Sequence, residues 1–173
     1  MNYFKQESER LKFRKLEIED IPSWRAFFVG NDRLKFLGID LSKKPDTLAA
    51  EWIERQLKRY EKEGLGHLAV ELKETDEFIG VGGIIPRTLE SKNEFEIAYS
   101  LLPKFWKNGY GTELAEQMKK YGFEKIKADR LVSIIDKENY DSINVAVKNG
   151  MKVLFETTYL GMDVEVYGII KNS

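Results

Sequence analysis

The chain of 173 residues contains no cysteine and only one histidine, His67. Without cysteine it can form no disulfide, no cysteine-ligated zinc site and no thiol nucleophile. A single histidine also excludes the multi-histidine sites that hold catalytic zinc. The sequence therefore predicts a functional site without a metal ion.

Long apolar runs are missing as well. No apolar segment approaches the roughly 18 residues that a helix needs to cross a bilayer. Residues 1–20 alternate charged and apolar side chains and lack the apolar core of a secretory signal. We expect a cytoplasmic protein that has no membrane partner.

The chain also lacks an excess of charge of one sign. Its 28 basic residues are opposed by 29 acidic ones, for a formal charge of −1. A nucleic-acid partner is therefore not expected, because a phosphate backbone selects a basic surface. Residues 101–130 differ, with seven Lys or Arg against four Asp or Glu. That local excess suits a small polyanionic ligand, although a solvated helix face gives the same count.

Hydrophobic periodicity divides the chain into alternating strands and helices. No linker, repeat or low-complexity segment interrupts it, which predicts one domain over residues 1–173. Strands are expected at 10–16, 67–72, 78–85, 94–102, 130–135, 153–158 and 164–170, and helices at 22–29 (N-cap Asp20), 49–60, 111–127 and 141–149. This order predicts an α/β fold, with helices packed on one mixed sheet.

The segment from Leu101 to Glu113 joins an expected strand to an expected helix through a loop with two glycines. The first N–H groups of a helix lack intrahelical partners, and the macrodipole adds positive charge there. Glycines let a phosphate approach such backbone closely, and Lys104 and Lys107 add charge at the rim. The pattern predicts an anion-binding loop, although two glycines also fit an ordinary strand-to-helix turn. The glycine motifs of nucleoside triphosphate loops and dinucleotide folds are absent.

The run Phe105–Glu113 reads Phe-Trp-Lys-Asn-Gly-Tyr-Gly-Thr-Glu. It resembles the acyl-CoA pyrophosphate loop of the GNAT superfamily, and in particular its RimJ/RimL-like branch of ribosomal-protein N-terminal acetyltransferases. That branch typically has Tyr-Trp-Gly-Lys-Gly-Tyr-Ala-Thr-Glu here, whereas the wider superfamily has Gln or Arg in place of Trp106. Three further blocks resemble the branch in the same order, and the match covers nearly the whole chain. They are Arg10–Leu16 with Glu19-Asp20, Glu96–Leu101, and Asn139-x-x-Ser142 with Lys148–Met151.

The resemblance implies a GNAT-like domain with a splayed, mostly antiparallel central sheet and acetyl-CoA as co-substrate. Strand 94–102 is expected to part from strand 130–135 at a bulge, so that the pantetheine arm enters the gap like an added strand. The backbone at Leu101 and the side chain of Asn139 are the implied pantetheine contacts. The implied pyrophosphate contacts are Lys107 at the rim and the amides of Asn108, Gly109, Tyr110, Gly111 and Thr112.

The implied reaction is direct attack of an amine on the thioester in a ternary complex. At pH 7.4 roughly a quarter of an α-amine is neutral, against about one lysine in a thousand, so an N-terminal substrate needs less help from a base. Glu96 is the candidate base, although a solvent-facing charge on an alternating strand gives the same pattern. Ser142 is the candidate acid toward sulfur, although a plain serine at a helix start fits equally. A backbone N–H near Leu101 polarises the carbonyl.

Other conspicuous side chains are expected to be structural. His67 falls within a strand, Trp24 and Trp52 recur at helical spacing as core or pocket wall, and Tyr140 lies beside a matched position rather than on one.

Three functions stay open at this point. The chain acetylates a protein N-terminal α-amine, or it acetylates a small molecule such as a polyamine, amino acid or antibiotic, or it binds acyl-CoA without catalysis. A polyamine would prefer an acidic pocket, for which Asp32, Asp40 and Glu54 are candidates. The expected assembly is a monomer or a homodimer.

Overall fold

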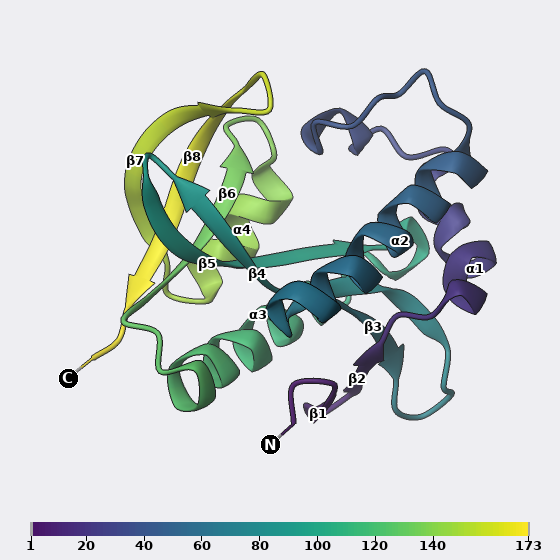
Figure 1. The fold of residues 1–173 in the computed structure, drawn as a ribbon, viewed down its shortest axis with the longest axis horizontal. Helices are drawn as coiled ribbons and strands as arrows, with labels where there is room; N and C mark the ends of the chain where they lie inside the picture. Colours follow the sequence, from purple (N-terminus) through teal and green to yellow (C-terminus); the bar gives the residue numbers. More distant parts are fainter. Residues whose placement is uncertain (1, 173) are drawn as a thin grey trace.

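The computed structural model describes residues 2–172. Its eight strands form one sheet in the order β1-β2-β3-β4-β5-β6-β8-β7 (Figure 1). Neighbouring strands are antiparallel except β5 and β6, so the predicted α/β fold with a mostly antiparallel mixed sheet is confirmed. The strands are β1 Lys5–Glu7, β2 Leu11–Lys15, β3 Gly66–Leu72, β4 Phe78–Leu89, β5 Lys92–Leu101, β6 Arg130–Asp136, β7 Lys152–Tyr159 and β8 Met162–Ile170. The α-helices are α1 Ile21–Arg25, α2 Pro45–Glu63, α3 Tyr110–Tyr121 and α4 Tyr140–Lys148.

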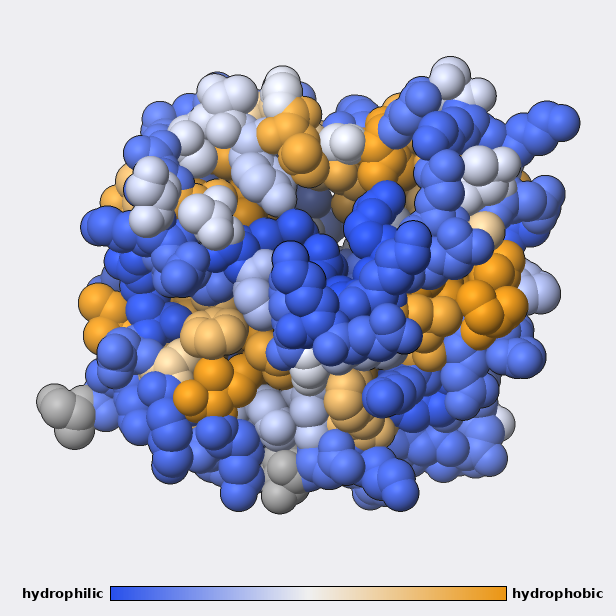
Figure 2. All heavy atoms as spheres, viewed as in Figure 1, coloured by the Kyte–Doolittle hydropathy of each residue, from blue (hydrophilic) through white to orange (hydrophobic). Residues whose placement is uncertain are grey.

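Helices cover both faces of the sheet. Leu68 and Val70 of β3 pack in the cluster that includes α3 and part of α4, whereas Ala69 packs with α1 and α2. Successive strand residues point to opposite faces, which explains why β3 is apolar without alternation. Figure 1 shows α2 lying across the near side of the sheet. In the same view hydrophilic side chains cover α2, and the surface is hollowed directly above them in the picture (Figure 2).

The parallel strands β5 and β6 pair over a very short stretch and then separate. Glu96 opposite Val132 is the one register pair recorded between them in residues 2–172. Next to it the Ser133 hydroxyl of β6 donates to the Ile97 carbonyl at 2.8 Å. From there to the end of β5 the two strands are open, as the resemblance implied.

The first helical region is more broken than expected. The predicted helix 22–29 is the short α1, flanked by 3-10 turns at Ile18–Asp20 and Ala26–Phe28. Asp20 stands at the N-cap of α1, as predicted, although its side chain makes no capping hydrogen bond to that helix. Its carboxylate instead accepts from the backbone N–H of Glu17 at 2.8 Å and pairs with Arg14.

Three other differences concern element boundaries. The helix expected to reach residue 127 ends at Tyr121 and continues as a π-helical turn over Gly122–Ile126. Strand β1 was not predicted, and β4 continues through Pro86, although proline cannot donate to a sheet ladder. The β4–β5 register is unbroken from Gly80/Leu101 to Leu89/Lys92, so the sheet opens without the predicted bulge in β5.

Candidate active site

The gap between β5 and β6 exposes main-chain groups of β5, and we call this gap the slot. Along a strand, the N–H and C=O groups of successive residues point alternately to the two sides. The Ile97 carbonyl accepts from Ser133 on β6, whereas the Leu102 N–H donates to β4 at 2.9 Å. The main-chain groups of Tyr99 and Leu101 therefore point into the slot. They offer an edge to which an extended ligand can add.

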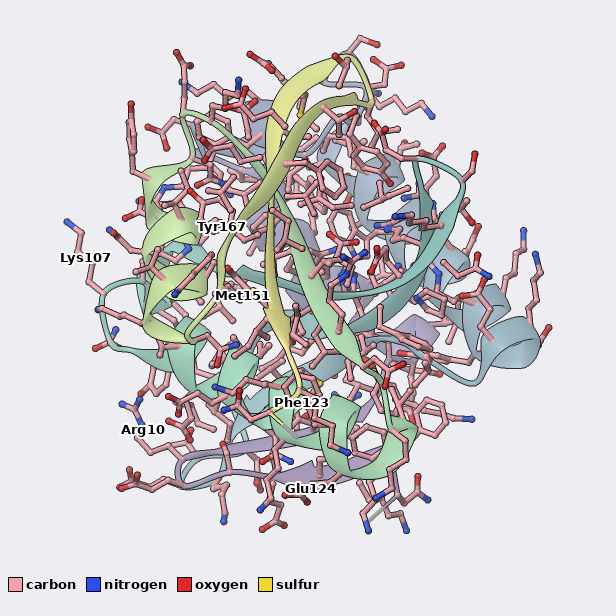
Figure 3. The ribbon with its side chains drawn as sticks, turned by 90° about the vertical axis from the view of Figure 1, so that its left-hand side faces the viewer. Arg10, Lys107, Phe123, Glu124, Met151 and Tyr167 are labelled. Atoms are coloured by element: carbon pink, nitrogen blue, oxygen red, sulfur yellow. The ribbon has the colours of Figure 1, made fainter. Side chains whose placement is uncertain are left out.

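The loop after β5 brings the start of α3 to the mouth of the slot. The Asn108 amide closes this loop by donating to the carbonyls of Phe105 at 3.1 Å and Trp106 at 3.0 Å. Gly109 has a φ of 79°, in the left-handed region that glycine adopts without strain from a Cβ atom. Lys107 also has a positive φ, and its side chain extends outward from the molecule (Figure 3).

The first turn of α3 presents unpaired donors. Its first helical hydrogen bond runs from the Glu113 N–H to the Gly109 carbonyl at 3.1 Å. The N–H groups of Tyr110, Gly111 and Thr112 precede that bond and have no partner within the helix. Together with the helix dipole they make a site for an anion. The predicted anion-binding loop is thus formed geometrically.

An ion pair between Arg10, near the N-terminus, and Glu113 of α3 holds this loop in place. The Glu113 carboxylate accepts from the Ser8 hydroxyl at 2.6 Å and from Arg10 Nε at 2.7 Å. The Arg10 guanidinium also donates to the Asn108 carbonyl at 2.9 Å and lies 4.5 Å from the centre of the Tyr110 ring. Burial raises the pKa of Glu113, but hydrogen bonds from Ser8 and Arg10 outweigh it and hold the pKa below its ordinary value.

A cavity of about 400 Å³ lies between the slot, α3 and α4. Eight of the predicted site residues line it: Leu101, Lys107, Gly109, Tyr110, Gly111, Thr112, Asn139 and Ser142. Asn108 and Glu96 are not among its lining residues, since Asn108 holds the loop and Glu96 lies in a neighbouring cavity. Lys104, expected at the rim, instead pairs with Glu77 at 2.6 Å.

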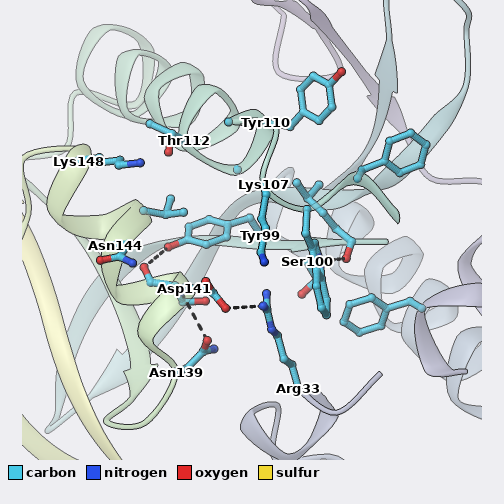
Figure 4. Close-up of a pocket in the computed structure, with 18 of the residues that line it drawn as sticks. Arg33, Tyr99, Ser100, Lys107, Tyr110, Thr112, Asn139, Asp141, Asn144 and Lys148 are labelled. Carbon is cyan, nitrogen blue, oxygen red and sulfur yellow. Dashed lines mark hydrogen bonds and ion pairs between the residues drawn. The ribbon is translucent and has the colours of Figure 1, made fainter. Parts of the chain in front are cut away.

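Arg33 also lines the cavity and was not predicted. It comes from the segment between α1 and α2, where no periodic pattern indicates a position. Its guanidinium lies 3.6 Å from the centre of the Trp106 ring and pairs with Asp141 of α4 (Figure 4). The Trp106 indole donates to the Leu101 carbonyl at 2.8 Å, so that this carbonyl is already used. Arg33 thus brings a positive charge to the place where the wider superfamily has Gln or Arg.

Lys148 is a second cation that sequence analysis missed. It lines the cavity from α4, on the same helix face as Ser142 and Val145 (Figure 4). The spacing of three residues along this helix was visible in the sequence and could have indicated it.

The start of α4 is tied to β5. Asn139 caps the helix by accepting from the Ser142 N–H at 3.4 Å. The Ser142 carbonyl accepts from the Tyr99 hydroxyl at 3.0 Å. Burial, and then the nearby charge of Glu96, raise the pKa of Tyr99, so the phenol stays protonated and donates. These bonds hold Ser142 beside the slot.

A second cavity, of about 140 Å³, adjoins the first. It lies toward α2, with Trp52 in its wall. The residues common to the two cavities are Leu37, Tyr99, Ser100, Asn139 and Ser142. A group in the first cavity and a group in the second can therefore meet at the slot.

Glu96 lines this second cavity and is buried, so its charge does not face solvent as an alternating strand alone would allow. Arg87 Nε donates to its carboxylate at 2.6 Å. Burial lowers the pKa of Arg87, but the charge of Glu96 outweighs it and holds the pKa above its ordinary value. A guanidinium therefore accompanies the candidate base.

His67 lines the same cavity, in contrast to the expectation that it is merely a strand residue. The Trp52 indole donates to its Nδ1 at 3.1 Å. Its Nε2 is buried and has no hydrogen-bond partner within residues 2–172. Burial, followed by the charges of Arg59, Arg87 and Arg55, lowers the pKa of His67 well below its ordinary value. The imidazole is therefore neutral at physiological pH.

Other expectations can be placed briefly. Trp24 is buried in the core, as predicted, and Tyr140 is 69% exposed and lines neither cavity. Among the described residues, no group of three or more His, Asp or Glu side chains is placed to hold a metal ion. No helix in the same range is both long and apolar enough to cross a membrane.

Comparison with known families gives one match over most of the chain. Residues 10–152 match the family model described as the acetyltransferase (GNAT) domain. The Bacillus subtilis protein YoaA, named as an N-acetyltransferase, is 27% identical over 173 aligned residues, covering 95% of this chain and 96% of YoaA.

Solved structures agree on the fold. An acetyltransferase from Agrobacterium tumefaciens superposes with a TM-score of 0.80 at 26% identity, covering 96% of this chain and 94% of its own. RimL, an α-N-protein acetyltransferase of a ribosomal protein solved in complex with coenzyme A, has a TM-score of 0.74 at 17% identity, covering 94% and 95%.

Proposed function

This chain belongs to the GNAT acetyltransferase family, and on that basis we propose that it transfers the acetyl group of acetyl-CoA to a primary amine by direct attack in a ternary complex. One observation carries the proposal. The slot between β5 and β6 has the unpaired N–H groups of Tyr110, Gly111 and Thr112 at its mouth. An extended arm that ends in a diphosphate needs this combination of a strand edge and an anion site.

The residues present fit acetyl-CoA. Tyr99 and Leu101 offer main-chain groups to an extended pantetheine arm, with the Leu101 carbonyl engaged by Trp106. The Asn139 oxygen caps α4, so the amide nitrogen of this side chain is the group proposed to contact the arm. Lys107 and Lys148 line the cavity as counter-charges for phosphate. RimL, which shares the fold, was solved in complex with coenzyme A, and this supports coenzyme A as the ligand class.

When bound, acetyl-CoA supplies the acetyl group as a thioester. We assign the Leu101 N–H to polarise the thioester carbonyl, because it points into the slot. Ser142 lines both cavities, and its hydroxyl is proposed to donate a proton to the departing sulfur. Glu96 is proposed to take the proton of the amine, directly or through a water molecule.

A carboxylate as the base favours an α-amine as the acceptor. Carboxylates are weak bases toward ammonium groups, and the carboxylate of Glu96 also pairs with Arg87. Because α-amines have a pKa of about 7.7–8.0, a weak base suffices for them, whereas lysine amines, near 10.4, would remain charged. A protein N-terminus is therefore the proposed acceptor, and a small molecule with an α-amine is the alternative.

Thermal denaturation with acetyl-CoA tests the binding half of this proposal. At a hundredfold excess over its dissociation constant the ligand should stabilise the fold by about 2.7 kcal/mol, which raises Tm by about 5–10 °C for a chain of this size. ATP and NAD should give little change. Release of free CoA with a panel of amines tests the catalytic half. Binding of acetyl-CoA without turnover of any amine would identify a non-catalytic module.

A further inference from the structure

The second cavity contains a hydrogen-bond donor for which neither the fold nor the proposed chemistry has a use. His67 is 6% exposed, and its Nε2 is buried without a partner in the described chain. Buried polar atoms are normally paired, because an unmade hydrogen bond costs about 1–3 kcal/mol. An unpaired atom of this kind in the wall of a cavity indicates a ligand group that completes it.

The hydrogen bond with Trp52 fixes what Nε2 can do. The indole N–H of Trp52 is only a donor, so Nδ1 of His67 must be the acceptor. A neutral imidazole carries one N–H, which is then at Nε2. The two rings lie within 16° of coplanar, and the backbone carbonyl of His67 is held by the Tyr60 hydroxyl. His67 therefore presents a fixed, uncharged N–H donor to the cavity and cannot serve as the base.

Arg87 adds a second set of donors to the same wall. Its Nε donates to Glu96, whereas its two terminal nitrogens donate no hydrogen bond to the described residues. The guanidinium also lies 5.8 Å from the centre of the Tyr159 ring, another residue that lines the cavity. The cavity thus joins N–H donors from His67 and Arg87 to two carboxylates, that of Glu96, which pairs with Arg87, and that of Asp136, whose Oδ1 accepts from the Glu138 N–H.

Ala98 of β5 also lines this cavity and contributes no more than a methyl group to its wall. The cavity is nevertheless small, at about 140 Å³. A cavity of about 150 Å³ accommodates a group of benzene size, so the acceptor's amine and its recognised group must lie within a few bonds.

We propose that His67 Nε2–H and the Arg87 guanidinium bind an oxygen of the acceptor, so that the enzyme selects amines with a carbonyl or carboxylate on the carbon that bears the nitrogen. This inference rests on the proposed acetyl transfer and names its acceptor class, an α-aminoacyl group. The group can come from a peptide N-terminus or from a free amino acid or its amide. A hydrogen-bonding site of this kind rejects analogues without the oxygen, because the buried donors stay unpaired.

The same geometry disfavours a polyamine. A second ammonium group would meet Arg87 and would leave Nε2–H of His67 without an acceptor. The acidic residues considered for a polyamine, Asp32, Asp40 and Glu54, are not among those that line this cavity.

Two matched amines test the proposal on the wild-type enzyme. Sec-butylamine carries an ethyl group where alaninamide carries its carboxamide, and the two amines are otherwise alike. Their kcat/KM values are compared after each is calculated from the concentration of the neutral amine. We expect alaninamide to be preferred at least tenfold, with 1,4-diaminobutane no better than sec-butylamine. Free alanine and a peptide beginning with alanine distinguish the two sources of the α-aminoacyl group. Equal rates for the two matched amines, or preference for the diamine, would overturn the proposal while leaving acetyl transfer intact.

Variants then assign the preference to the two donors. His67→Phe combined with Trp52→Phe removes both partners of the buried bond. In this variant the ratio of the kcat/KM for alaninamide to that for sec-butylamine should fall about tenfold. His67→Gln, which can keep an N–H near Nε2, should retain more of the preference than His67→Phe. Because the readout is a ratio within each variant, a loss of stability does not imitate it.

Arg87→Lys keeps the positive charge opposite Glu96 but removes the planar donor set. We expect it to reduce the same preference, whereas Arg55→Lys, on an exposed turn of α2, should leave it unchanged. If His67 and Arg87 variants lower the rates with both amines equally, the two residues serve the fold or Glu96 and the oxygen-binding role is wrong. If no amine is acetylated although acetyl-CoA binds, it is instead the proposed function that fails.

Discussion

Arg33 and Asp141 form an ion pair, with 2.5 Å between Nη2 and Oδ2, that joins the segment before α2 to the first turn of α4. Both residues line the larger cavity, and Arg33 also lies over the Trp106 ring. The pair therefore places one cation and one anion at the site proposed for the phosphates of acetyl-CoA. Their effects on binding should have opposite signs.

Arg33→Gln should raise the Kd for acetyl-CoA about tenfold, because it removes a counter-charge, whereas Asp141→Asn should lower it slightly. Isothermal titration at low and high salt measures both, and the Arg33 effect should shrink at high salt. Arg25→Gln is the matched control, since its pair with Asp46 is exposed and outside the cavity. If the Arg33 and Asp141 variants weaken acetyl-CoA binding equally, the ion pair only stabilises the fold.

Gly111→Ala should separate binding from stability. A Cβ atom at Gly111 would meet Val145 at 3.5 Å and Leu101 at 4.0 Å, which are ordinary contacts, so the fold should keep or gain up to about 1 kcal/mol. The same methyl group narrows the space between α3 and α4, and the Kd for acetyl-CoA should rise about tenfold. Lys120→Ala, exposed on the same helix, is the control. If Gly111→Ala leaves the Kd for acetyl-CoA unchanged, the ligand does not bind between α3 and α4.

Glu113 should contribute stability that depends on pH. Its folded pKa is lowered, since hydrogen bonds from Ser8 and Arg10 outweigh burial. The contribution is therefore fully present above the unfolded pKa of about 4.3 and is lost as the pH falls through the folded pKa. Glu113→Gln should destabilise the protein at pH 7, and the difference from wild type should shrink below about pH 4. A difference that stays constant or widens as the pH falls would contradict the assignment.

Ser133→Ala removes the bridge from the Ser133 hydroxyl of β6 to the Ile97 carbonyl of β5 at the start of the slot. The Ile97 carbonyl then loses its partner in a buried position, which should cost about 1–3 kcal/mol of unfolding free energy. Affinity for acetyl-CoA should stay within about twofold, because Tyr99 and Leu101 keep their direction. Urea unfolding and calorimetry measure the two quantities. A large loss of affinity at unchanged stability would mean that this bond shapes the slot.

Sequence patterns predicted the parts of the fold that local chemistry determines. Helix α2 contains the predicted helix 49–60, and α3 begins at Tyr110, one residue before the predicted start at Gly111. Boundaries failed where tertiary contacts override local preference. Pro86 stays within β4, and the Asp20 carboxylate binds Arg14 and the Glu17 N–H rather than the N–H groups of α1.

The sequence predicted more of the residues that line the larger cavity than of those that line the second cavity. Its residues follow one another in the loop and in the start of α4, so their nearness is local. The second cavity joins His67, Arg87 and Glu96 from three different strands, and that nearness depends on register across the sheet. Arg33 comes from an irregular segment, for which no periodicity predicts a direction.

Amide hydrogen exchange resolved by residue tests the central claim most directly. Adding CoA should slow exchange at Tyr99 and Leu101 in the slot and at Gly111 and Thr112 in the first turn of α3, while an equal concentration of ATP should leave the slot amides unchanged. If CoA binds and the slot amides exchange as fast as before, the coenzyme does not lie between β5 and β6, and the account is wrong.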